Sequence, residues 1–173
     1  MPAVTGVIQQ TGHWTTSIRA AVLAAGLGAV AVGIALAAVA ARASDADEFY
    51  RQGQVLYNAG KLSEAVPLFR QAQRLAPLSS TAMHSIYFEA MGLFRQNHFV
   101  EAEKVFRRLL TDFPEAQASA ESLYNVGICR ARLGDPTGAV EAWEETERRF
   151  ADTTWGAQAR ARLAQAAAKE TGG

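Results

Sequence analysis

Along most of the chain, apolar residues recur at a spacing of three and four, which is the spacing of amphipathic helices. No stretch shows the one-by-one alternation of a half-buried strand, so the pattern predicts an all-α protein. The predicted helices come in pairs. Their first members lie near residues 46–58, 82–95 and 119–132, and their second members near residues 63–75, 99–111 and 136–149.

The three helix pairs repeat one another at an interval of 37 residues. Small residues, turn residues and large aromatic residues each recur at that interval, and Pro77 and Pro114 close the first two units. The matching sets are Gly53, Ala90 and Gly127; Gly60, Asn97 and Gly134; Ala65, Ala102 and Ala139; and Phe69, Phe106 and Trp143. The small sets should let the helices of a pair touch, and the aromatic set should fill the space between pairs. Such an interval is typical of an array of stacked helix pairs.

Two of the predicted helix starts carry a capping signal. Ser63 is a candidate N-cap for the second helix of the first pair. Asp135 followed by Pro136 is an N-terminal signal for the second helix of the third pair.

The strongest change in composition lies near the start of the chain. Between Arg19 and Arg42 stand 22 residues without a charged or polar side chain, mostly Ala, Val, Leu and Gly. A helix of that length spans about 33 Å, enough for the ~30 Å hydrocarbon core of a bilayer. We therefore predict a single transmembrane helix over residues 19–42. A small residue at every fourth position predicts a packing face for another membrane helix, formed by Ala25, Ala29, Gly33 and Ala37.

The fate and orientation of this segment stay open. Ala41 and Ala43 flank Arg42 in the form of a signal-peptidase site, so cleavage near Ala43 would release a secreted periplasmic protein. The length of the apolar run favours a retained anchor. Arg42 and Arg51 weakly favour a cytoplasmic C-terminal side, whereas a long domain after a single N-terminal segment favours export. We expect a single-pass membrane protein with its repeats in the periplasm.

The small residue, the turn glycine, the Ala-x-x-x-aromatic spacing and the closing proline resemble the tetratricopeptide repeat. The resemblance covers about residues 45–151, although the usual interval of that repeat is 34 and the links between units are longer here. It is similar to tetratricopeptide proteins of the bacterial envelope, of the Tol-Pal coordinator and outer-membrane assembly type. It implies an α-solenoid of three helix pairs with a C-terminal capping helix. The expected parts are a tail over 1–18, the transmembrane helix, units over about 45–79, 82–116 and 119–151, and a cap over 152–169.

In that family the first helix of each pair lines a groove that holds a peptide. Carried over, the resemblance implies a groove formed by Asp47, Tyr50, Gln54, Tyr57 and Asn58 in the first unit, by His84, Tyr87, Met91, Phe94 and Arg95 in the second, and by Glu121, Tyr124, Ile128, Ala131 and Arg132 in the third. Tyrosines recur in this set at the repeat interval, which suits peptide binding. A purely structural role for half-buried tyrosines explains the same spacing equally well. Eukaryotic relatives clamp a C-terminal carboxylate with Lys and Asn, and the tyrosines here argue against that ligand.

Charge and chemistry narrow the function further. Lys plus Arg and Asp plus Glu both number 17, which argues against a nucleic-acid partner. Cys129 stands alone, and His13, His84 and His98 lack metal-ligand spacing, so we expect no disulfide, metal, cofactor or small-molecule substrate, and no enzyme. We expect a membrane-anchored adaptor or scaffold for protein partners in the bacterial cell envelope. The alternative is an accessory structural subunit of a larger membrane protein complex.

Overall fold

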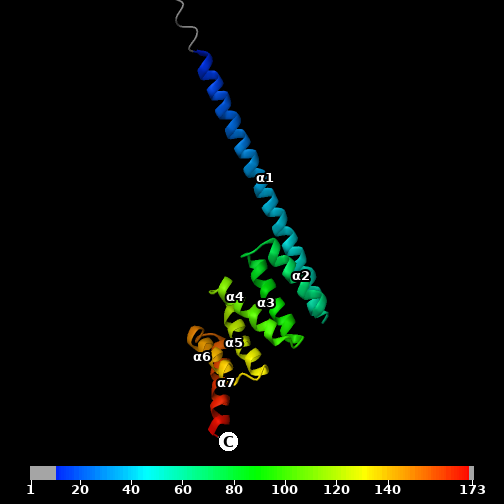
Figure 1. Cartoon of the computed structure of the whole chain (residues 1–173), viewed down its shortest axis with the longest axis vertical. Coiled ribbons are helices and arrows are strands. Elements are labelled where there is room, and N and C mark those ends of the chain that lie inside the picture. The colour runs from blue at the N-terminus through cyan, green and yellow to red at the C-terminus, as the bar shows by residue number, and fades with distance from the viewer. Residues whose placement is uncertain (1–10, 172–173) are drawn as a thin grey trace, which may run out of the picture. The chain divides into compact units, whose positions relative to one another are not determined.

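The computed structural model describes residues 11–171 of the chain, and side chains over residues 34–168. Every regular element in the described part is a helix (Figure 1). The helices are α1 (Thr11–Asn58), α2 (Leu62–Leu75), α3 (Ser80–Arg95), α4 (Phe99–Asp112), α5 (Gln117–Arg132), α6 (Pro136–Arg149) and α7 (Thr154–Thr171). The predicted all-α class is confirmed.

The chain divides into two compact units, Met1–Arg42 and Ala43–Gly173. In the second unit each helix from α2 onward packs against the one that follows it, and α5 also contacts α7. The result is a stack of helix pairs, with α2, α4 and α6 as second helices (Figure 1). This is the solenoid that the repeat interval predicts.

Small residues face large ones inside each pair, as the sequence predicts. A Cβ atom added to Gly53 would lie 2.7 Å from the ring of Phe69, so α1 and α2 approach too closely there for any side chain. Gly127 faces Trp143 in the same way, at the equivalent place of the third pair. Both aromatic residues are buried. The register of the repeats is therefore confirmed by packing.

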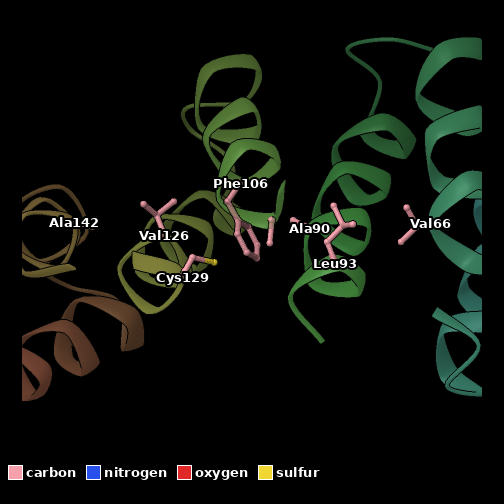
Figure 2. Close-up of a cluster of buried hydrophobic side chains, with 8 residues drawn as sticks. Val66, Ala90, Leu93, Phe106, Val126, Cys129 and Ala142 are labelled. Atoms are coloured by element: carbon pink, nitrogen blue, oxygen red, sulfur yellow. The ribbon is translucent and has the colours of Figure 1, made fainter. Parts of the chain in front are cut away.

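One apolar cluster runs across successive units and ties them together (Figure 2). Its members come from five consecutive helices: Val66, Ala90, Leu93, Ala102, Phe106, Val126, Cys129 and Ala142. Phe106 is fully buried and occupies the central place in the cluster, next to α3 and α5 (Figure 2). Burial of a side chain of this size contributes about 2–3 kcal/mol.

The turns between paired helices share one backbone conformation. Gly60, Asn97 and Gly134 all have positive φ, at 76°, 63° and 80°, which is the left-handed conformation expected of these residue types. Each is the middle residue of the three-residue connection to the following second helix.

One of the two predicted N-caps is confirmed, and the other is wrong. The Asp135 carboxylate accepts a hydrogen bond from the backbone N–H of Gly138 at 2.8 Å, which confirms its role at the start of α6. Ser63 is not a cap, because α2 already begins at Leu62 and its N-cap position belongs to Lys61. The sharp turn at Gly60 starts the helix earlier than the serine indicated. Ser79 caps α3 instead, accepting from the N–H of Ala82 at 3.0 Å.

Helix α1 is longer than either helix predicted for its residues. It begins at Thr11, inside the predicted tail, and continues to Asn58. Nothing between Arg42 and Phe49 breaks a helix, since that stretch has neither Gly nor Pro and two alanines. Over residues 34–168, whose side chains are described, no helix combines the length and apolar character that a membrane crossing needs. Of the predicted packing stripe, Ala37 is exposed, whereas Ala25, Ala29 and Gly33 precede residues 34–168, over which burial is described.

Candidate protein-binding face

The first helices of successive units lie side by side and form one face. We call the side formed by residues 43–58 of α1, by α3 and by α5 the first-helix face. Its contacts join residues 34 positions apart: the Tyr87 hydroxyl donates to Glu121 at 2.7 Å, and the Asn125 amide contacts the Met91 sulfur at 3.8 Å. The repeat interval is 37, so each of these side chains contacts a residue of the next unit that lies three positions before its own equivalent there. Three positions are about one helical turn. The structure thus brings together Tyr87 and Glu121, two of the residues implied for the groove.

In the first unit the face is built from packed rings. Tyr50 lies 6.0 Å from the ring of His84 and 6.1 Å from that of Phe69, and its hydroxyl accepts from the Gln54 amide at 2.7 Å. Burial raises the pKa of Tyr50. Tyr57 packs edge-on against Phe88 at 5.2 Å. His84 itself is exposed, so one ring of this group is open to a partner.

Phe88 is the central ring between the first two units, and sequence reasoning missed it. It stacks on Phe69 at 5.6 Å and also contacts Tyr50, Tyr57 and Tyr87. Its equivalents at the repeat interval are Arg51 and Asn125, so no recurring aromatic signal marked the position.

In the second unit Tyr87 is half-buried and internally bonded. Burial raises the pKa of Tyr87, and the hydrogen bond to Glu121 raises it further. Met91 is half-buried against the apolar cluster. The rings of Phe94 and Phe99 meet edge-on at 5.4 Å, which links the end of α3 to the start of α4.

In the third unit the capping helix covers two of the implied groove residues, Tyr124 and Ile128. Tyr124 is only 7% exposed, lies 5.3 Å from the ring of Trp155 and accepts from the Arg162 guanidinium at 3.1 Å. Ile128 packs in the same cluster with Trp155 and Leu163 of α7. The tyrosine at this position is structural, so Tyr124 and Ile128 do not form an open surface.

The end of the face near the turns is basic and aromatic. The guanidinium of Arg95 lies 4.8 Å above the ring of Tyr57, and that of Arg132 lies 6.0 Å from the ring centre of Phe99. Both arginines are exposed. Such stacking holds a guanidinium by cation–π attraction.

The described residues show little catalytic chemistry. Over this part of the chain no three His, Cys, Asp or Glu side chains gather as a metal site would require. Cys129 is fully buried, and burial raises the pKa of its thiol to about 12. A pocket of about 660 Å³ opens between the end of α5, the start of α6 and α7, lined among others by Pro136, Trp143 and Ala166. Of the implied groove residues, this pocket includes Ala131.

Stacked helix pairs with this small-to-large packing define a class of helical-repeat protein. The family model of the tetratricopeptide repeat matches residues 49–79 and 121–153, which are the first and third pairs. These two pairs match the tetratricopeptide repeat, and the middle pair has the same arrangement of helices.

Solved structures share the fold at low sequence identity. The type III secretion translocator chaperone SycD of Yersinia enterocolitica is 11% identical and has a TM-score of 0.63, covering 73% of this chain and 95% of its own. PcrH in complex with the chaperone binding region of PopD is 17% identical with a TM-score of 0.62, covering 72% and 92%. The first tetratricopeptide domain of Spaghetti (RPAP3) bound to an HSP90 peptide is 17% identical with a TM-score of 0.59, covering 73% and 95%.

A curated relative is similar over part of its length. The chain is 31% identical over 110 residues to a cGAMP-activated phospholipase of Vibrio cholerae serotype O1 (strain ATCC 39315 / El Tor Inaba N16961). The match covers 58% of this chain and 29% of the relative, so the chain spans less than a third of that protein.

Proposed function

We propose that this protein is an adaptor whose first-helix face binds a segment of a partner protein. The observation that carries the proposal is the surface at α1 and α3, where exposed His84 and Arg95 stand on a layer of packed rings. Rigid aromatic side chains with polar edges are typical of protein interfaces. Two structures of the same fold, PcrH and RPAP3, are described in complex with segments of other proteins, which supports this use of the fold.

The open part of the face belongs to the first two units. Tyr50, Tyr57 and Tyr87 are half-buried, whereas Tyr124 lies under α7. A bound segment would therefore lie across residues 43–58 of α1 and across α3, and would meet the third unit only near exposed Arg132. Catalysis is not part of the proposal.

Selection from a random peptide library against the full chain tests this function. The peptides obtained should bind the unmodified protein and lose most of their affinity for H84A/Y87A, which removes two side chains of α3 from the face. The control K104A/R107A changes two exposed residues of α4, a second helix, and should bind as before. Unfolding curves of both variants show whether the fold is kept. Peptides that ignore H84A/Y87A but fail on K104A/R107A would place the binding surface on the second helices.

We propose in addition that residues 19–42 attach the adaptor to a membrane, in the cell envelope. The specific observation is that Ile34, Leu36 and Val39 are 66%, 65% and 63% exposed in α1, and exposed apolar groups of this kind favour an apolar surrounding. Attachment would raise the local concentration of the face near membrane partners.

Cell fractionation tests the attachment. A full-length chain that stays with membranes in alkaline carbonate and leaves them only in detergent would support it. Full-length protein in the soluble fraction, or a mature form beginning at Ser44, would contradict it. A stoichiometric complex that survives detergent gel filtration would favour the structural-subunit alternative over the adaptor.

A further inference from the structure

We infer that the end of the first-helix face marked by Arg95 and Arg132 binds a partner segment through two acidic side chains. This inference rests on the proposed function and names the chemistry of the segment. It is carried by four observations on the described residues.

The first observation is that neither arginine has an anionic partner. Over the part of the chain with described side chains, neither the Arg95 nor the Arg132 side chain makes an ion pair or a hydrogen bond, and the contact of each is with a ring. Other arginines of the same helices and their neighbours are paired: Arg130 of α5 contacts Glu103 at 3.0 Å, and Arg70 of α2 contacts buried Glu89 at 2.6 Å. The two exposed guanidinium groups on the face are therefore left with their donors free.

The second observation is that both groups are already positioned. Arg95 lies over Tyr57, and Arg132 lies over Phe99. A ring engages the flat side of a guanidinium and leaves its edge, which carries the N–H donors, available for a carboxylate. Because the side chains are held, less rotamer entropy is lost when a partner binds.

The third observation concerns two acids of the same face, Asp47 and Glu121, which are engaged within it. Asp47 accepts a hydrogen bond from Thr81, and Glu121 accepts one from Tyr87. Both lie toward the opposite end of the first helices, whereas the arginines lie at the end near the turns. Glu101, in the first turn of α4, makes no ion pair with either arginine. Among the residues of the first helices at this end, the unmatched charge is positive, so an acidic segment is the complementary partner.

The fourth observation is the spacing. Arg95 and Arg132 occupy equivalent places, 37 residues apart, in adjacent first helices, and packed helix axes lie about 8–10 Å apart. An extended segment in the polyproline II conformation rises about 3.1 Å per residue with three residues per turn, so acidic residues three positions apart lie on the same side and about 9 Å apart. The partner we infer is an extended segment with that spacing and an apolar residue between the acids, which would face Phe94 and Phe99. This differs from recognition of a C-terminal carboxylate, because side-chain carboxylates are bound.

Fluorescence anisotropy with two labelled peptides tests the inference on the full chain in detergent. The probes are Gly-Ser-Glu-Leu-Gly-Glu-Ser-Gly and the same peptide with Gln in place of both Glu residues. The unmodified protein should bind the Glu peptide about fivefold more tightly, as expected for two exposed ion pairs. The preference should shrink between about 50 mM and about 500 mM salt. R95Q/R132Q should lose it, and R74Q/R148Q, which removes two exposed arginines of α2 and α6 and the same charge, should keep it.

Three results would overturn the inference: equal binding of both peptides, binding of neither, or loss of the preference in R74Q/R148Q as well. The proposed function is judged separately by the selected peptides and H84A/Y87A, which leaves both arginines in place. If those peptides bind and depend on α3 while the Glu and Gln probes bind equally, the adaptor stands and only the acidic segment is wrong.

Discussion

The second and third repeats place the same residue in two different settings. Tyr87 and Tyr124 occupy one position of the repeat, 37 residues apart. Tyr87 is half-buried and bonds to Glu121 of the next first helix, whereas Tyr124 is 7% exposed beneath Trp155 and Arg162. The difference comes from the neighbour. The contact with α5 leaves Tyr87 half-buried, whereas α7 closes over Tyr124 of α5.

This comparison shows that a repeated residue does not imply a repeated role. Tyr124 stabilises the junction with the capping helix, and its cluster contains Ala139, Trp143 and Ala159. Tyr87 links two helices and still contributes to an accessible surface. The surface for a partner therefore lies on the first two repeats, with Arg132 as the third repeat's contribution.

Ala102→Arg should unfold the second and third repeats together, because it disrupts the helix stack that both repeats share. Ala102 is fully buried in the cluster with Ala90 and Phe106. An arginine there would overpack the core and bury a charge, which should cost more than about 3 kcal/mol. Urea unfolding should show no cooperative transition. Glu101→Arg, at an exposed neighbour, should unfold normally, and a normal transition for Ala102→Arg would mean that the register is wrong.

Tyr124→Ala against Tyr87→Ala is the direct test of the two settings. Removing the buried ring should cost about 3 kcal/mol, and removing the half-buried one about 1 kcal/mol. Urea midpoints of the two variants give the difference. Equal losses would show that α7 does not cover the third repeat in solution.

Alkaline pH should destabilise the core of the third repeat through ionisation of the Cys129 thiol. The folded pKa of Cys129 is raised from 9.0 to about 12, so its stabilising contribution is complete below pH 9 and is lost as pH rises toward 12. At about pH 10 the loss should be about 1 kcal/mol. Urea midpoints measured across this range should fall less steeply for Cys129→Ala than for the unmodified chain. The same slope for both would mean that the thiol is accessible in the folded state.

Asp135→Ala should have the smallest of these effects. Loss of the cap at the start of α6 should cost about 1 kcal/mol, whereas Ser63→Ala, inside α2 and exposed, should change stability by less than about 0.5 kcal/mol. Thermal unfolding of both variants measures the contrast. If Ser63→Ala were the more damaging change, the start of α2 would have to be redrawn.

More of the fold than of the candidate site could be predicted from the sequence. The register followed from Gly53, Phe69 and their equivalents, because close helix packing demands a small residue opposite a large one. The central ring of Phe88 could not be found, since the repeat has no aromatic residue at its equivalent positions. The burial of Tyr124 depends on how α7 packs on α5, and a repeat interval contains no information on that contact. The sequence predicted two helices where α1 is one. The boundary between them was placed where the residues change from apolar to amphipathic, and such a change does not by itself end a helix.

Site-specific photo-crosslinking in cells that make the protein tests the central claim most directly. A photoreactive amino acid is placed at the position of His84 on the first-helix face or at that of Lys104 on α4, both exposed. The account predicts that a defined partner protein is crosslinked from position 84 and not from position 104. Crosslinks to the partner from position 104 alone would contradict it.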